Sequence, residues 1–259
     1  MTAVPSRPDP IDRITPTRLP SDRTVMYQRW AHLLFLHWAI PPETLQSLIP
    51  PGLDLDTFEG QAYVGLVPFT MMGVRPVGVP ALPGLSAFHE TNVRTYVHRM
   101  GRDPGVWFFS LDAANALAVR VARALWKLPY HFARMALEFS PKTGSIAPEI
   151  RYQSERLWPG PHPAACALSY TPTGTPAPAQ AGTLEHFLIE RYILYSTAHG
   201  RLYQGRVHHA PYPVQSATVH ALDESLLAAA GIARPNPAPL VHYASEVRVR
   251  IYPLHALAT

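Results

Sequence analysis

Polar and apolar residues alternate most regularly over residues 88–99, "FHETNVRTYVHR". Successive side chains of a β-strand point to opposite faces, so this alternation predicts a strand. One face carries Glu90, Asn92, Arg94, Tyr96 and His98, and the other carries Thr91, Val93, Thr95 and Val97. The polar face has two interpretations: it lines a cavity inside a barrel, or it faces water on a half-exposed strand.

Short β patterns bounded by Gly or Pro run along most of the chain. Strands are predicted at 106–113, 131–140, 146–156, 165–172, 191–198, 201–210, 213–222 and 241–254, with a hairpin at 52–72 turning near Glu59-Gly60. Segment 26–40 is long and apolar enough for a strand or a helix, and Pro41-Pro42 ends it. Residues 73–85 hold too many Gly and Pro for a regular element and predict a loop.

Helical patterns are few and mostly short. They cover 41–50, the Ala- and Leu-rich 112–127 ended by Pro129, 184–190 with Thr183 as cap, and 223–231 ended by Gly231. Many strands with few helices predict a mainly β fold, a β-rich α+β barrel or sandwich that is largely antiparallel. We expect a single domain over residues 25–259, preceded by a disordered Pro-rich tail over residues 1–24.

Composition narrows the classes of partner. The 22 basic and 18 acidic residues give a net charge of +4, and no stripe of Lys and Arg appears, so no nucleic acid partner is expected. The first 23 residues have no apolar core, so neither a signal peptide nor a membrane span is predicted, and a cytoplasmic protein is expected. The single cysteine, Cys166, excludes an internal disulfide and predicts a small buried side chain.

The sequence indicates no metal and no cofactor. His208 and His209 are adjacent on a predicted strand, so they point to opposite faces and cannot share a metal ion without a bend. One ordered histidine, His209, is instead a candidate acid, base or hydrogen-bond donor. No Gly-rich phosphate loop, dinucleotide motif or Gly-x-Ser-x-Gly elbow occurs.

Five motifs occur in an order and spacing that resemble a known family. They are "LLFLHWAIPPETLQSLIPPGLDLDTFEGQAYVGLVPF", "FHETNVRTYV", "GVWFFSLDA", "LWKLPYHFARM" and "ERYILY". Together they resemble the uncharacterised bacterial proteins known as YqjF-like, over about residues 26 to 252. That family has no established activity that the resemblance can transfer.

The YqjF-like proteins are in turn similar to the acetoacetate decarboxylase superfamily, which implies a cone-shaped antiparallel β-barrel with a ligand cavity. The decarboxylases place a glutamate on a strand, an arginine and a tryptophan on a helix, and then Pro-Lys-Lys. Glu90, Arg123, Trp126 and Pro129 match these positions. Tyr130 and His131 stand where the two lysines of the decarboxylases stand, so the Schiff-base lysine is absent.

Lys127 is the only lysine near that position, and it has two interpretations. Arg123 lies four residues earlier on the predicted helix, and a neighbouring cation favours the neutral, nucleophilic amine. A lysine in the last turn of a helix also complements the helix dipole without any catalytic role. Because Lys127 precedes Pro129 by two residues, we favour the helix end and expect no lysine-dependent decarboxylation.

Two functional hypotheses follow from the residues and the resemblance. The first is a lyase- or hydrolase-like enzyme that acts on a small carbonyl or carboxylate compound by acid–base chemistry, with Glu90, Tyr130 and His131 as catalytic candidates. The second is a non-catalytic protein of the same fold that binds a small organic ligand. In both, the candidate ligand-binding residues are Asn92, Arg94, Arg123, Tyr192 and His209, the ligand is expected to be anionic, and a homo-oligomer is possible.

Overall fold

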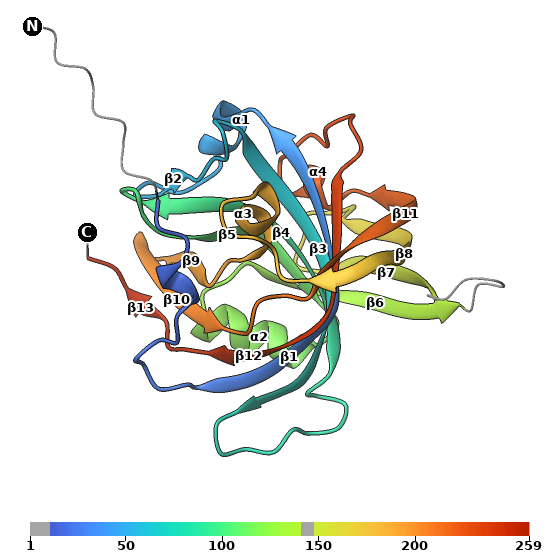
Figure 1. The fold of residues 1–259 in the computed structure, drawn as a ribbon. Coiled ribbons are helices and arrows are strands. Elements are labelled where there is room, and N and C mark those ends of the chain that lie inside the picture. Colours follow the sequence, from blue (N-terminus) through green and yellow to red (C-terminus); the bar gives the residue numbers. More distant parts are fainter. Residues whose placement is uncertain (1–10, 141–147, 259) are drawn as a thin grey trace, which may run out of the picture.

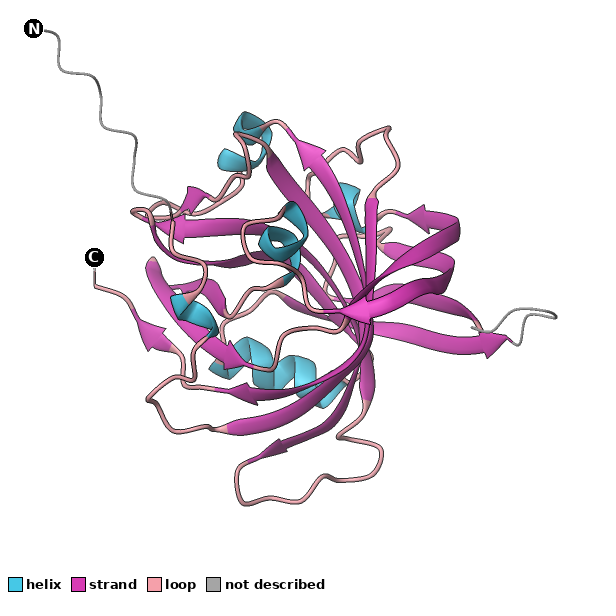
Figure 2. Ribbon diagram, viewed as in Figure 1, coloured by secondary structure: helices cyan, strands magenta, loops and turns pink. Residues whose placement is uncertain are grey.

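The computed structural model describes residues 11–140 and 148–258, and it is mostly β-sheet with a few short helices (Figure 2). The elements in chain order are η1 (Thr15–Thr17), β1 (Met26–Ile40), α1 (Pro42–Gln46), β2 (Asp54–Leu55), β3 (Ala62–Pro76), β4 (Phe88–Arg99), β5 (Arg102–Ala113), α2 (Ala116–Leu125), β6 (Tyr130–Ser140), β7 (Glu149–Trp158), β8 (Ala165–Ala177), α3 (Leu184–Ile189), β9 (Ile193–Ala198), β10 (Arg201–His208), β11 (Val214–Glu224), α4 (Leu226–Ala229), β12 (Leu240–Ile251) and β13 (His255–Ala256). The mainly β prediction is therefore confirmed.

All described strands belong to one sheet that closes on itself. Hydrogen-bonded pairs lead from β12 through β1, β3, β4, β5, β9 and β10 back to β12, which makes a closed ring. Strands β6, β7, β8 and β11 lead from β5 back to β12 and lie to one side of this ring (Figure 1). Pairing is antiparallel except where β5 meets β6 and β9, as far as the described strands go.

Strands β1, β3 and β4 contribute side chains from their two faces to two hydrophobic cores. One core fills the ring and includes Phe35, Val67, Leu111 and Val249. The other packs the outer face of β1, β3 and β4 against β7, β8, α1 and α4. The outer face of β4 takes part through Thr91, whose Oγ1 lies 2.8 Å from the Tyr152 hydroxyl.

Three local expectations from the sequence are corrected. The segment 52–72 is no hairpin, because β2 pairs with β4 and only Phe58 and Gln61 form a bridge across the turn. Strand β3 is flanked by β1 and β4 over most of its length, which leaves no edge for β2. The predicted helix at 112–127 begins later, since Asp112 belongs to β5 and Asn115 caps α2 by accepting from the Ala118 amide at 3.0 Å.

The third correction concerns the N-terminal segment. Residues 1–10 lie outside the described residues, but residues 11–24 contact the body of the protein and are not a free tail. Pro16 and Pro20 are buried, and Arg13 forms an ion pair with buried Asp56. The Arg13 guanidinium also lies 5.1 Å from the Phe187 ring centre. The segment is ordered because a buried carboxylate and an aromatic face hold its arginine.

Within residues 11–140 and 148–258, no helix has the length and apolar character that crossing a membrane requires.

Candidate ligand cavity

The ring encloses a cavity of about 390 Å³. Its lining comes from β1, β3, β4 and β5, from α2 and β6, and from single residues of later strands. Most lining side chains are apolar, among them Trp30, Phe35, Phe69, Met71, Leu111 and Trp126. Four polar or ionisable side chains form what we call the polar end: Glu90, Asn92, Arg94 and Tyr130.

Strand alternation on β4 places three members of the polar end. Glu90, Asn92 and Arg94 occupy every second position, so all three point into the ring. They are 2%, 5% and 8% exposed, which excludes the alternative of a polar face in water. The next residues on this face leave the cavity, because Tyr96 is buried beyond its lining and His98 reaches the far end of the strand.

Glu90 forms a buried pair with Tyr130. The Tyr130 hydroxyl donates to Oε2 of Glu90 at 2.8 Å. Burial raises the pKa of Glu90 to about 8, and the bond from Tyr130 opposes that rise only in part. Burial and the neighbouring Glu90 carboxyl raise the pKa of Tyr130 well above its usual range. At neutral pH both groups therefore carry their protons, and Glu90 is a carboxylic acid able to donate one.

Arg94 brings a buried positive charge to the polar end. Its Nη2 donates to the Leu188 carbonyl at 3.2 Å and lies 3.5 Å from the Tyr96 hydroxyl, while its Nε has no partner in the described residues. Arg94 forms no ion pair with any described carboxylate, although a buried charge is normally paired. Asn92 Oδ1 also lacks a described partner. A guanidinium in the cavity lining with no carboxylate partner among the described residues suits an anionic ligand.

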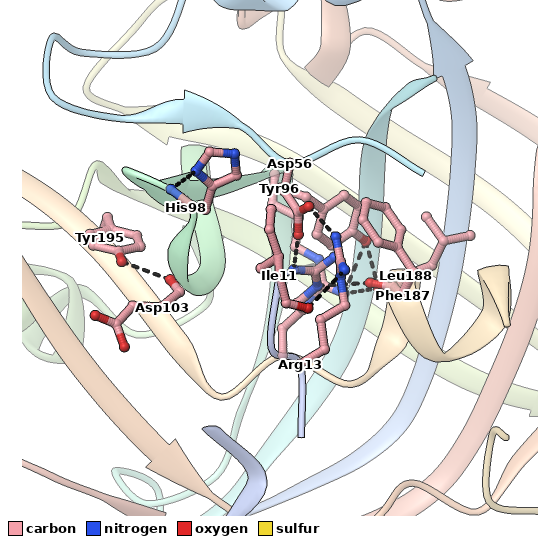
Figure 3. A network of polar contacts seen from close by, with 12 residues as sticks. Ile11, Arg13, Asp56, Tyr96, His98, Asp103, Phe187, Leu188 and Tyr195 are labelled. Atoms are coloured by element: carbon pink, nitrogen blue, oxygen red, sulfur yellow. Dashed lines mark hydrogen bonds and ion pairs between the residues drawn. The ribbon is translucent and has the colours of Figure 1, made fainter. Parts of the chain in front are cut away.

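A second layer of polar contacts involves Asp56, Tyr96 and Leu188 (Figure 3). The Tyr96 hydroxyl donates to the Leu188 carbonyl at 2.6 Å and lies 2.6 Å from Nε2 of His37. Burial, and then the nearby Arg94 charge, hold the pKa of His37 well below its usual range, so His37 is neutral. Farther out, Arg191 donates to Asp56 at 2.6 Å and faces the Tyr96 ring. These contacts connect β4, which carries Arg94, to β1 through His37 and to α3 through Leu188.

His131 lies outside the cavity, although it follows Tyr130 directly. Adjacent residues on β6 point to opposite faces, so the strand that brings Tyr130 into the cavity turns His131 away from it. Nδ1 of His131 lies 2.8 Å from the Pro159 carbonyl, and burial lowers the pKa of the ring. The structure gives His131 no contact with the cavity that a catalytic role requires.

Arg123 and Lys127 also lie outside the cavity, in an open recess of about 630 Å³ on the other side of the α2–β6 connection. Nη1 of Arg123 donates to the Tyr130 carbonyl at 2.6 Å, so it supports the backbone of the polar end. Lys127 follows α2 and lies with its Nζ 5.1 Å from the Tyr203 ring centre. The structure thus places Lys127 just beyond the helix end and not at the polar end.

Tyr192 and His209 form an aromatic stack behind the cavity wall. Their ring centres lie 4.4 Å apart, and His209 is equally close to Tyr212, which does line the cavity. Burial lowers the pKa of His209 to about 4. The Tyr192 hydroxyl donates to Glu190 at 2.5 Å, and that carboxylate accepts from the Tyr212 amide. Both predicted ligand-binding residues therefore support the wall and do not line it.

The apolar part of the lining was not expected from the sequence. Trp30 and Phe35 of β1, and Ala118, Val121 and Trp126 of the α2 region, form much of the wall. On α2 the sequence did contain a usable pattern, since Ala118, Val121 and Ala122 are spaced so that they share one face of a helix. In β1 no such signal existed, because an irregularity in the strand changes which positions face inward.

The described residues contain no group of three or more His, Cys, Asp or Glu side chains placed to hold a metal ion. The cavity lining itself contains no His, Cys, Ser or Lys. Its polar end therefore supplies one carboxyl group, one phenol, one amide and one guanidinium, and the rest of the lining adds the amides of Gln28 and Asn115 and the phenol of Tyr212.

Comparison with known sequences identifies relatives over nearly the whole chain. The model of a family of uncharacterized conserved proteins, DUF2071, matches residues 27–248. The protein YqjF of Bacillus subtilis (strain 168), itself described as uncharacterized, is 39% identical over 236 residues. That match covers 91% of this chain and 94% of YqjF.

Solved structures with a similar fold include several enzymes. The enduracididine biosynthesis enzyme MppR, in complex with pyruvate, has a TM-score of 0.62 at 13% identity over 91% of each chain. An acetoacetate decarboxylase-like enzyme from Sphingomonas wittichii RW1 has a TM-score of 0.62 at 14% identity, covering 91% of this chain and 94% of that one. Acetoacetate decarboxylase from Legionella pneumophila has a TM-score of 0.60 at 12% identity, with 93% and 90% coverage. At these identities the likeness establishes the fold.

Proposed function

Because the chain belongs to the DUF2071 family and has the acetoacetate decarboxylase-like fold, we propose that its cavity binds a small carboxylate that carries a carbonyl group. We further propose that the protein is a lyase-like enzyme that acts on this compound by proton transfer. The observation that carries the proposal is the buried Glu90–Tyr130 pair in the same cavity as Arg94, which has no counter-ion among the described residues. MppR complexed with pyruvate supports the choice of ligand, since pyruvate is a carboxylate with an adjacent carbonyl.

Three groups at the polar end, on Arg94, Asn92 and Glu90, have a role in this proposal. Arg94 binds the carboxylate through its guanidinium, which has no carboxylate partner among the described residues, and Asn92 orients the polar group next to it. Glu90 in its acid form donates its proton to the carbonyl oxygen while a water molecule accepts a proton from the adjacent carbon, which gives the enol. The reverse transfers restore the carbonyl and return a proton to Glu90. Because Glu90 is neutral near pH 7, it does not repel an anionic ligand.

The polar end has no amine for a Schiff base. Tyr130 occupies the position where the decarboxylases carry their reactive lysine, and a phenol cannot form an imine. Lys127 faces Tyr203 in the outer recess. We therefore propose chemistry without a covalent intermediate. Incubation with pyruvate or acetoacetate and borohydride, followed by mass spectrometry, is expected to give no adduct on Lys127, and such an adduct would refute this part of the proposal.

Hydrogen exchange at carbon tests the proposal whatever the product of the reaction is. Pyruvate is incubated with the protein in D₂O, and loss of its methyl proton signal is followed by NMR. Wild-type protein is expected to accelerate exchange, while Glu90→Gln and Arg94→Gln reduce it by about 100-fold or more. His131→Gln is the matched control, because His131 lies outside the cavity and should exchange at the wild-type rate.

A binding protein without catalysis is the second candidate. The raised pKa of Tyr130 and the neutral state of Glu90 leave the polar end without a strong base, which favours recognition over catalysis. Calorimetry with pyruvate, acetoacetate and lactate separates the two functions. Binding that is lost in Arg94→Gln, with no exchange and no turnover in the wild type, would support the binding protein and contradict the enzyme.

A further inference from the structure

We propose that the natural ligand is a carboxylate with an apolar chain or ring of about five carbons or more, and not a three- or four-carbon acid. This inference rests on the proposed function, since it takes Arg94 as the site of the carboxylate. It concerns the rest of the cavity, which the acid–base chemistry leaves unused.

The wall beyond the polar end is apolar on several sides. Phe69 and Met71 of β3, Trp30 and Phe35 of β1, and Leu111 of β5 all line it. A polar ligand placed here would lose hydrogen bonds with water and gain none from the wall. An apolar chain or ring gains from leaving water, and its contacts fill the space between these side chains.

Two polar side chains on this wall are already engaged within the protein. Gln28 Oε1 accepts from the Trp30 indole at 2.7 Å. Asn115 accepts from the Ala118 amide at 3.0 Å and donates to the Leu85 carbonyl at 3.0 Å. The fully buried side-chain atoms of the lining that have no described partner, Asn92 Oδ1 and Arg94 Nε, belong instead to the polar end. The cavity therefore recognises one polar end of a ligand and offers hydrophobic contact to the remainder.

The opening of the cavity is apolar as well. Leu85, in the connection from β3 to β4, and Leu117 and Val121 on α2 line the cavity, yet they are 46%, 56% and 39% exposed. These three residues mark where the cavity reaches the surface. When the carboxylate of a ligand binds the buried Arg94, the hydrocarbon chain of that ligand extends along the apolar wall toward Leu85, Leu117 and Val121.

The size of the cavity agrees with this ligand class. A volume of about 390 Å³ falls in the range of about 300–1,000 Å³ that encloses drug-sized ligands. A three-carbon acid would occupy the polar end and leave the apolar space to water. Water in such space has few polar partners, so displacing it by hydrocarbon is favourable.

A chain-length series tests the inference. Calorimetry compares pyruvate, 2-oxobutanoate, 2-oxohexanoate and 2-oxooctanoate, which share one head group and differ in hydrocarbon length. We expect the affinity to rise by about two- to fourfold for each added methylene. A series that binds with equal affinity at every length would overturn the inference and leave the proposed function intact, whereas failure of every member to bind would refute both.

Two variants on different sides of the first turn of α2 provide a matched pair. Ala118→Trp fills the apolar part of the cavity, because Ala118 lines it, whereas Ala116→Trp places the same ring at an exposed position outside the lining. We expect Ala118→Trp to remove most of the gain in affinity that the wild type shows with increasing ligand chain length. Ala116→Trp should show the same rise in affinity with ligand chain length as the wild type. If Ala118→Trp is folded by circular dichroism and its affinity still rises with ligand chain length as in the wild type, the hydrocarbon chain of the ligand does not lie against α2.

Discussion

The Tyr130 hydroxyl on β6 lies 2.8 Å from Oε2 of Glu90 on β4, inside the closed ring of strands. The two residues are 40 positions apart in the chain. Strand β5 lies between their strands and joins them, since it pairs with β4 on one side and with the start of β6 on the other. The contact therefore depends on the branch point where β6 leaves the ring. Burial inside the ring, which outweighs the hydrogen bond from Tyr130, keeps the Glu90 carboxyl protonated at neutral pH.

The Glu90→Gln variant is expected to be more stable than the wild type at pH 8. Folded Glu90 keeps its proton up to a pKa of about 8, whereas in the unfolded chain it loses the proton near its ordinary value of 4.5. Between these values the folded state binds more protons, so the free energy of unfolding of the wild type falls as pH rises. At about 1.4 kcal/mol per pKa unit the effect reaches several kcal/mol. Glutamine cannot ionise, and it still accepts a hydrogen bond from Tyr130.

Urea unfolding of both proteins at pH 5 and pH 8 measures this effect. The advantage of Glu90→Gln should be large at pH 8 and small at pH 5. Parallel stability profiles of the two proteins across this range would show that the pKa of Glu90 does not differ between the folded and unfolded states.

The Tyr130→Phe variant is expected to raise the pKa of Glu90 further. The hydrogen bond from Tyr130 lowers the pKa of Glu90 against the larger effect of burial, and phenylalanine removes that bond while keeping the ring. Infrared spectroscopy of the protonated carboxyl group, followed as a function of pH, reports the change, with Glu90→Gln to identify the band. A fall in the pKa of Glu90 would mean that water or a rearranged side chain replaces the phenol.

The buried ion pair of Asp112 and Arg156 predicts a large loss of stability when one partner is removed. Nε and Nη2 of Arg156 donate to the two Asp112 oxygens at 2.6 and 2.8 Å, and both side chains are almost fully buried. Asp112→Asn should cost about 3–5 kcal/mol, because it leaves the guanidinium without a counter-charge.

Denaturant unfolding of a double variant, Asp112→Leu with Arg156→Met, tests the cause of that loss. The double variant should lose less stability than Asp112→Asn, since neither charge remains buried. The exposed pair of Arg134 and Glu155 serves as a control, and Glu155→Gln should change stability by less than about 1 kcal/mol. An equal loss in the single and double variants would indicate that packing, and not charge, accounts for the effect.

The His209→Phe variant is expected to resist acid better than the wild type. Burial lowers the pKa of folded His209 to about 4, while the unfolded value is near 6.5. The unfolded chain therefore binds more protons as pH falls from 6.5 to 4, and the folded state loses stability. Phenylalanine keeps a ring between Tyr192 and Tyr212 but cannot be protonated. Thermal unfolding at pH 7 and pH 5 measures the difference, and an equal drop in both proteins would exclude His209 as the cause.

Local patterns in the sequence determined much of the secondary structure. The alternation over 88–99 placed Glu90, Asn92 and Arg94 on one face, because the period of a strand is two residues wherever the strand lies. Thr183 caps α3, and the hairpin around His199-Gly200 forms as predicted. The same period also separates His131 from Tyr130, so strict use of it would have removed His131 from the site.

Contacts between distant segments of the chain decided which residues of β1 face the cavity. His32 takes a positive φ of 54°, and the pairing of β1 with β3 shifts between Ala31 and Leu36. Inward-facing positions on β1 consequently change from Gln28 and Trp30 to Leu33 and Phe35. A period of two cannot reveal this shift.

The alternation on β4 determined which of its residues share a face. Closure of the ring decided that this face borders an apolar cavity and not water, because the surroundings of a strand depend on segments far from it in the chain. The same closure raises the pKa of Glu90, since a carboxyl group responds to the burial that its neighbours impose and not to its position in the sequence.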